Sequence, residues 1–148
     1  MTQTEITAIL AGFVGTIGFA IMFNIRGVRL VAVAIGGLLS WLLVVLLGNY
    51  ISNEPVVYFI TASLISVYAE IMARVLKTPT TAFITTSLIP LIPGGSLYYT
   101  MVHAFKGDMN TFLPKAIYTL QLSSALALGI IISIALARVL NKFMRRIK

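Results

Sequence analysis

Residues Thr78–Phe105 read TPTTAFITTSLIPLIPGGSLYYTMVHAF and carry no formal charge. As one continuous helix this stretch would be about 42 Å long at 1.5 Å per residue, which exceeds a hydrocarbon layer of roughly 30 Å. Pro90 and Pro93 interrupt it, because proline lacks an amide hydrogen and clashes with the carbonyl four residues earlier. Gly94 and Gly95 then allow the backbone to leave the helical region. The stretch is therefore predicted to cross a membrane as a helix that is broken near the midplane.

The composition of the whole chain is that of a membrane protein. Of its 148 residues, 59% are hydrophobic and 10% are charged, whereas soluble domains are roughly 45–50% apolar and about 25% charged. A soluble domain of this length could not bury so much apolar surface. The chain contains no cysteine, which excludes disulfide scaffolds, thiolate metal sites and cysteine nucleophiles.

Five apolar runs are long enough, alone or extended past one acid, to cross a membrane as helices, which takes about 20 residues. They cover residues 6–25, 30–53, 55–73, 78–105 (broken at 90–95) and 116–137. We therefore predict an all-α integral membrane protein with about five transmembrane helices in a single domain, residues 1–148. Four crossings remain if the weaker third run or the broken fourth run does not span.

The basic residues lie in or beside the gaps between these runs, and cytoplasmic loops carry an excess of Lys and Arg. With the N-terminus outside, nine of the eleven fall on the inner side: Arg26, Arg29, Arg74, Lys77, Arg138, Lys142, Arg145, Arg146 and Lys148. The outer gaps hold Lys106 and Lys115. We expect an outer N-terminus and a cytoplasmic C-terminus. No basic face with interleaved aromatic residues exists, which argues against a nucleic-acid partner.

The two halves of the broken helix are predicted to present opposite dipole ends to one another. Carbonyls of Thr86–Ile89 end the first half and favour a cation or a proton donor, whereas amides of Gly94–Ser96 begin the second half and favour a carboxylate. Discontinuous helices at the midplane form the substrate site of many secondary transporters, because their unpaired backbone needs a polar cavity. The alternative is a proline kink with a purely structural role.

The segment Pro79–Met101, above all PLIPGGSLYYTM, resembles the signature of the threonine/serine exporter family. The similarity extends to a basic loop before the signature and a last helix rich in small residues. It is closest to the short subunit of the split, two-chain members, whose relatives include amino-acid exporters and a succinate exporter.

This resemblance implies one half of an inverted-repeat transporter in a bacterial inner membrane. It further implies a larger complementary membrane subunit as partner, export of threonine, serine or dicarboxylates driven by the proton gradient, and no cofactor. A non-transporting subunit that stabilises such a complex is the alternative. Together with the break, the resemblance gives candidate substrate-binding residues Thr86, Ser87, Pro90, Pro93, Gly94, Gly95, Ser96 and Tyr99.

Glu70 is the acid expected to lie within the hydrocarbon, where carboxylates are costly and often functional. It is therefore the candidate for proton coupling. Arg74 follows four residues later, a favourable helical spacing for an ion pair, so a structural pair is the alternative. His103, near the outer end of the fourth run, is expected to be solvated at the interface.

Small residues recur at helical spacing in three runs, and such residues let membrane helices approach closely. The last run has Ala125, Gly129, Ser133 and Ala137, with Gln121 one turn earlier, and glycines recur in the first two runs. These seams are expected to be contacts between helices of this chain, and the alternative is that one of them faces a second chain.

An intramembrane enzyme would need a nucleophile with a base, or a metal with several His, Asp or Glu ligands. The chain has one histidine and four acids, and these are spread along its length. We therefore expect neither catalytic residues nor a metal site.

Overall fold

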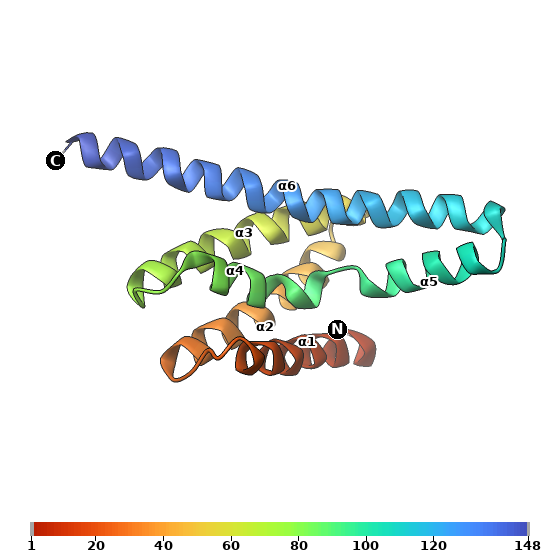
Figure 1. The fold of residues 1–148 in the computed structure, drawn as a ribbon, viewed down its shortest axis with the longest axis horizontal. Helices are drawn as coiled ribbons and strands as arrows, with labels where there is room; N and C mark the ends of the chain where they lie inside the picture. Colours follow the sequence, from red (N-terminus) through yellow and green to blue (C-terminus); the bar gives the residue numbers. More distant parts are fainter. Residues whose placement is uncertain (1, 148) are drawn as a thin grey trace.

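The computed structural model describes the backbone of residues 2–147 and the side chains of residues 2–139. This part of the chain is helical, as predicted, and has no strand. Its elements are α1 (Gln3–Met22), α2 (Val28–Gly48), α3 (Glu54–Val75), α4 (Thr80–Leu88), the 3₁₀ turn η1 (Ile89–Leu91), α5 (Gly94–Phe105) and α6 (Met109–Ile147). The helices run back and forth along the long axis of the molecule, and α4, η1 and α5 follow one another as one interrupted path (Figure 1).

Within the described part of the chain, four helices are long and apolar enough to cross a membrane: α1, α2, α3 and the Met109–Val139 part of α6. The apolar segment Thr80–Leu91 is too short to cross by itself. A fifth crossing therefore requires α4, η1 and α5 together, which is the broken crossing predicted from the sequence.

The core lies where α2, α3 and α4 meet, with α1 packed on α2 and α6 packed on α3. Val33, Ile65 and Phe83, one residue from each of the three central helices, are almost completely buried. In Figure 1, α1 and α6 lie on opposite sides of this centre. The first half of the broken path, α4, is thus packed against α1, α2 and α3.

Most of the small-residue seams are contacts within the chain. A Cβ atom added to Gly37 of α2 would lie 1.9 Å from Thr16 Oγ1 of α1, and one added to Gly129 of α6 would lie 2.7 Å from the Phe59 carbonyl of α3. Ser133 Oγ of α6 donates a hydrogen bond to the Ser63 carbonyl of α3, at 3.1 Å. The seam on the last helix therefore packs against α3.

The last helix begins at Met109, before the apolar run 116–137 that was predicted to cross the membrane. The carboxylate of Asp108 accepts a hydrogen bond from the Thr111 amide at 3.2 Å, which caps the helix start. Gly107, with φ 70°, ends α5 just before it. Of the polar gap at 106–115, only residues 106–108 form a turn between helices. The rest of the gap, including Pro114, belongs to the first turns of α6.

α5 and the start of α6 form a hairpin that projects beyond α3. Thr100 Oγ1 of α5 lies 3.1 Å from Thr119 Oγ1 of α6. The neighbouring Tyr118 hydroxyl donates to the Glu54 carboxylate at the first residue of α3. Residues 101–117 consequently extend past the end of α3, by about 12 Å along the α6 arm at 1.5 Å per residue. Figure 1 shows this hairpin reaching past the bundle.

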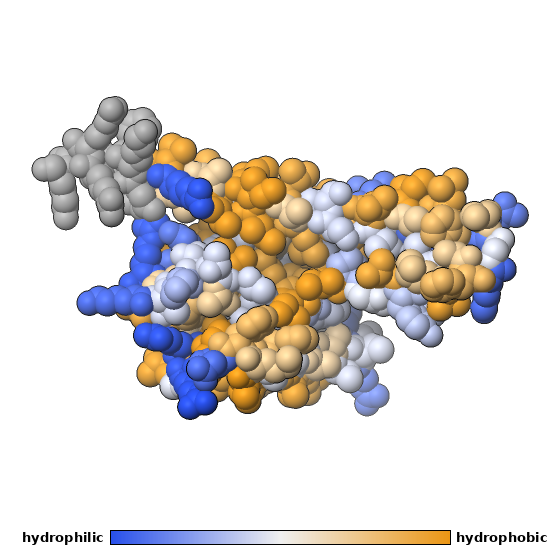
Figure 2. Space-filling model, in the orientation of Figure 1, coloured by the Kyte–Doolittle hydropathy of each residue, from blue (hydrophilic) through white to orange (hydrophobic). Residues whose placement is uncertain are grey.

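Charged residues gather at the two ends of the molecule, with an apolar band between them (Figure 2). Arg26 and Lys77 are exposed in the α1–α2 and α3–α4 connections, which lie at the same end in Figure 1. We call this the basic end. The last four basic residues assigned to the inner side lie outside the described side chains: Lys142, Arg145, Arg146 and Lys148.

Candidate functional site

The helix breaks between η1 and α5 because two prolines stand three residues apart. Ile92, which precedes Pro93, has φ −58° and ψ 126°, an extended conformation that a following proline favours. Its amide donates to the Ile89 carbonyl at 3.1 Å, which closes the 3₁₀ turn. The first half therefore continues past the expected end at Ile89, through Leu91.

The two glycines do not make the break, which corrects the expectation from the sequence. Gly94 and Gly95 are the first two residues of α5, and neither has a positive φ. The Gly94 amide is not free either, since it donates to the Ile92 carbonyl at 2.6 Å. Both glycines are exposed, and a Cβ atom on either would meet no atom within 4 Å. Their role in this chain is to leave the start of α5 open.

The Pro90 carbonyl is held by a residue that the sequence did not single out. Trp41 Nε1 of α2 donates a hydrogen bond to it at 3.1 Å. In a continuous helix this carbonyl would accept from the Gly94 amide, which is turned to Ile92 instead. The prolines imply that a carbonyl at the break needs a hydrogen-bond donor. The sequence does not show that the donor is Trp41, because the two residues are 49 positions apart.

Two hollows flank the break. One, of about 300 Å³, lies between α1, Trp41 and Pro90, and its α1 wall consists mainly of small residues such as Gly12 and Gly15. The other, of about 500 Å³, lies between the α4–η1 segment and α6, and Pro93 is at its end. We call the second hollow the α4–α6 groove.

Thr86 and Ser87 are completely buried in α4 and line neither hollow. Thr86 Oγ1 donates to the Ala82 carbonyl at 2.7 Å, within its own helix. Ser87 Oγ has no hydrogen-bond partner among the residues that the structure describes, and it faces Gly36 of α2, where an added Cβ atom would lie 2.4 Å away. Both side chains thus lie in the packed core between helices and not in a hollow.

Ser96 and Tyr99 lie on α5, beyond the break. The Ser96 carbonyl accepts from Thr100 Oγ1 at 2.8 Å. Tyr99 is exposed, stands edge-on to the Tyr98 ring, and has the Lys115 Nζ atom 5.7 Å from its ring centre. The structure thus brings Pro90, Pro93, Gly94, Gly95 and Ser96 together at the break, and places Tyr99 about one turn further along α5.

Glu70 lies far from the break, near the basic end of α3. Its Oε1 atom accepts from Arg74 Nε at 3.0 Å and from Arg74 Nη2 at 2.6 Å. Thr80 of α4 and Arg138 of α6 also interact with this carboxylate. The predicted i, i+4 pair is therefore present.

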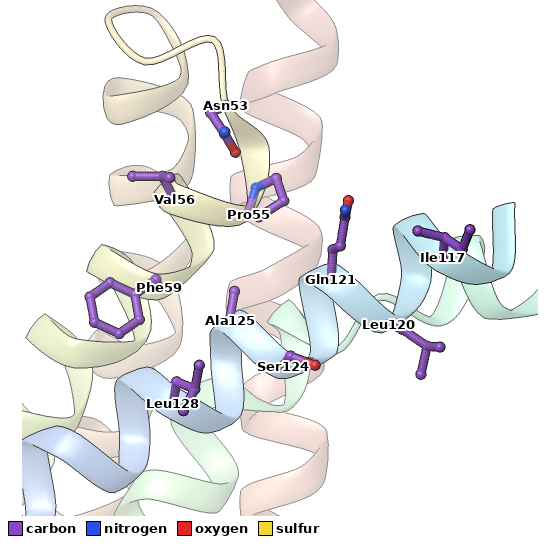
Figure 3. A pocket seen from close by; sticks show the side chains of 10 residues that line it. All are labelled: Asn53, Pro55, Val56, Phe59, Ile117, Leu120, Gln121, Ser124, Ala125 and Leu128. Carbon is purple, nitrogen blue, oxygen red and sulfur yellow. The ribbon is translucent and has the colours of Figure 1, made fainter. Parts of the chain in front are cut away.

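A third hollow, of about 620 Å³, lies between the start of α3 and α6. Figure 3 shows its walls, with Pro55 and Phe59 on one side and Gln121 and Ala125 on the other. The Gln121 amide points away from the α6 axis into this opening. The sequence placed Gln121 at the polar end of the seam but gave no sign of the hollow, because α3 and α6 are far apart in the chain.

His103 and Asp108 join the two ends of the turn between α5 and α6. His103 Nδ1 lies 3.2 Å from Asp108 Oδ2. Hydrogen bonds from Thr111, and then the one from His103, hold the pKa of Asp108 below its usual value. The histidine thus has a partner in addition to the interfacial position that was expected.

A family model described as threonine/serine exporter, ThrE, matches residues 8–136. This chain belongs to the threonine/serine exporter family. The match covers both the broken crossing and the last helix, so the resemblance first noted in the signature is confirmed. The chain is thereby a member of a transporter family and not of an enzyme family, and its long apolar helices are those of a membrane protein. Comparison with curated proteins and with solved structures found no significant match.

Proposed function

We propose that this exporter is one subunit of a secondary transporter for small carboxylate-bearing metabolites, either threonine- or serine-type amino acids or succinate-like dicarboxylates. The observation that carries the proposal is the open start of α5 in the middle of the broken crossing. There Gly94 and Gly95 are exposed, and no side chain caps the helix.

The substrate carboxylate would bind the amides of Gly95 and Ser96. Helix-start amides without an internal partner carry a partial positive charge and accept an anion. The N-cap residue is Pro93, whose side chain cannot accept a hydrogen bond from them. Trp41 holds the preceding carbonyl of Pro90, which fixes the position of the break relative to α2.

The site needs a second chain to close it, because protein surrounds the break on some sides only. α5 packs on α6, and Thr100 is its single buried residue. The hollow beside α1 and Pro90 is also open to the surroundings. A larger partner that carries the complementary, oppositely oriented half would supply the missing walls, as inverted repeats do in other transporters.

We further propose that the proton gradient drives export and that the chain lies in a bacterial inner membrane with its N-terminus outside. The chain has no native cysteine, so single substitutions can be labelled cleanly. Thr2→Cys should react with an impermeant thiol reagent in intact cells, and Lys148→Cys should react only after the cells are opened. The opposite pattern would reverse the orientation.

The decisive experiment is substrate efflux with Gly95→Leu, measured beside a pull-down of the partner. We expect efflux to be lost while the complex still assembles, because the new side chain would cover the helix-start amides, and its Cβ atom would have no neighbour within 4 Å beyond its own helix turn. Ser96→Ala should have a smaller effect, since the amides remain. Gly48→Leu is the matched control, because Gly48 is also exposed but ends α2.

Normal efflux with Gly95→Leu would remove the substrate site from this segment. In that case, deletion of the whole chain is the next measurement. If the deletion removes the partner from the membrane and Gly95→Leu does not, the chain is a stabilising subunit that does not itself bind substrate.

A further inference from the structure

The α4–α6 groove has the depth of one membrane leaflet. It runs from Thr81, at the start of α4, to Ile92 at the break. These residues are eleven positions apart, or about 17 Å at 1.5 Å per residue. This length is close to half of a hydrocarbon layer of roughly 30 Å. The lining is almost entirely apolar, with Leu88 on one wall and Ile130 and Ile134 on the other.

Both walls of the groove end in a basic residue at the basic end of the molecule. Arg138 follows Ile134 by four residues and so lies one turn further along the same face of α6. Lys77 precedes Thr81 by four residues, in the turn before α4. Both side chains are exposed, and neither forms a salt bridge among residues 2–139.

The acid nearest to these residues does not cancel their charge. Glu70 is bound by Arg74 and also interacts with Arg138. With Lys77, the mouth of the groove therefore carries three positive charges and one negative charge. An apolar groove with a positive mouth is complementary to a molecule that has an apolar chain and an anionic head.

We infer that the α4–α6 groove binds one acyl chain of an anionic phospholipid, with Lys77 and Arg138 holding the headgroup phosphate. Basic sites between membrane helices on the cytoplasmic side bind such headgroups, and anionic lipids are abundant in that leaflet. The inference does not depend on what the exporter transports or on where its substrate binds.

A helix of a partner chain fits the groove less well. The groove is an open hollow of about 500 Å³, so a helix about 10 Å wide could place only one of its faces in it. A protein segment would also need an acid beside Lys77 and Arg138. An acyl chain needs only the apolar walls and a phosphate.

The first test measures lipid selectivity on the purified full chain by native mass spectrometry, with phosphatidylglycerol and phosphatidylcholine mixed in equal amounts. We expect a bound phosphatidylglycerol, with a preference of about fivefold or more, since each basic residue at a membrane surface contributes roughly that factor. Lys77→Gln combined with Arg138→Gln should abolish the preference. Arg26→Gln combined with Arg29→Gln also removes two positive charges from the basic end, and this variant should keep the preference for phosphatidylglycerol.

The second test locates the lipid with a fluorescent reporter in the groove. In a Trp41→Phe background, Ile134→Trp should be quenched more by brominated phosphatidylglycerol than by brominated phosphatidylcholine. Val14→Trp, at a position of α1 that is 65% exposed, should be quenched equally by both. Circular dichroism and the Val14 reporter establish that each variant is folded and inserted, and if the double charge variant does not fold, the two single variants take its place.

Three results would overturn the inference. The first is that the parent chain binds the two lipids equally. The second is that the Arg26 and Arg29 double variant loses the preference as fully as the Lys77 and Arg138 double variant does. The third is that neither lipid quenches the Ile134→Trp reporter. The last result would mean that protein covers the groove.

Discussion

Trp41 of α2 donates its indole hydrogen to the carbonyl oxygen of Pro90, at 3.1 Å, and so bridges the second helix and the broken one. The contact is possible because the ring lies against Gly12 of α1. A Cβ atom at Gly12 would be 2.2 Å from Trp41 Cδ1. One glycine on α1 thus makes room for the side chain that satisfies the break.

Replacing this donor should destabilise the protein. Trp41→Phe removes the donor to the part-buried Pro90 carbonyl, and a hydrogen bond of this kind contributes about 0.5–1.5 kcal/mol. We expect a lower midpoint of thermal unfolding in detergent. Tyr50→Phe is the control, because Tyr50 is 88% exposed and removal of its hydroxyl should leave the midpoint unchanged. Equal midpoints for Trp41→Phe and the parent would show that the bond is not needed.

The contact between α1 and α2 predicts opposite effects of the same substitution at two glycines. In Gly37→Ala the new methyl group would lie 1.9 Å from Thr16 Oγ1, and Thr16 is completely buried. Overpacking of this kind costs typically about 1–3 kcal/mol. Gly18→Ala meets no atom within 4 Å and should stabilise the helix by up to about 1 kcal/mol. Thermal unfolding of both variants tests this difference, and a stable Gly37→Ala would contradict the packing of α1 on α2.

The sequence predicted what depends on local chemistry. Pro90 and Pro93 locate the break because a missing amide hydrogen acts wherever the residue stands, and the i, i+4 spacing locates the Glu70–Arg74 pair for the same reason. What the sequence did not predict depends on distant neighbours. The Trp41 bond, the burial of Ser87 against Gly36 and the hollow beside Gln121 each join segments more than thirty residues apart. Gly94 shows a further limit, because glycine permits a non-helical backbone but does not require one.

Substitution of Glu70 tests whether the Glu70–Arg74 ion pair couples proton movement to export. Glu70→Gln keeps the size of the side chain and removes its charge. Because two nitrogens of Arg74 already bind the carboxylate, we expect export to keep its pH dependence and stability to fall by only about 0.5 kcal/mol, as for other helical pairs. Arg74→Gln is the matched variant, since it breaks the same pair from the other side. A flattened pH profile in Glu70→Gln but not in Arg74→Gln would instead make Glu70 the coupling residue.

The turn between α5 and α6 should lose its order in acid. The bonds from Thr111 and His103 lower the pKa of Asp108, so the folded turn favours the ionised carboxylate. The stability that this group contributes is complete above its unfolded pKa of about 3.9 and is lost as the pH falls through the lower, folded value. Protection of the Thr111 amide from hydrogen exchange, corrected for the intrinsic rate, should therefore be constant near neutrality and decrease below about pH 4.

Asp108→Ala removes both the cap and the partner of His103, so the Thr111 amide should exchange quickly at every pH. Asn110→Ala, two positions away on the same turn, should leave that amide protected, because Asn110 is exposed and the Thr111 amide donates to Asp108. Protection that persists in Asp108→Ala would mean that packing of α6 against α5, for example between Thr100 and Thr119, holds the helix start without the cap.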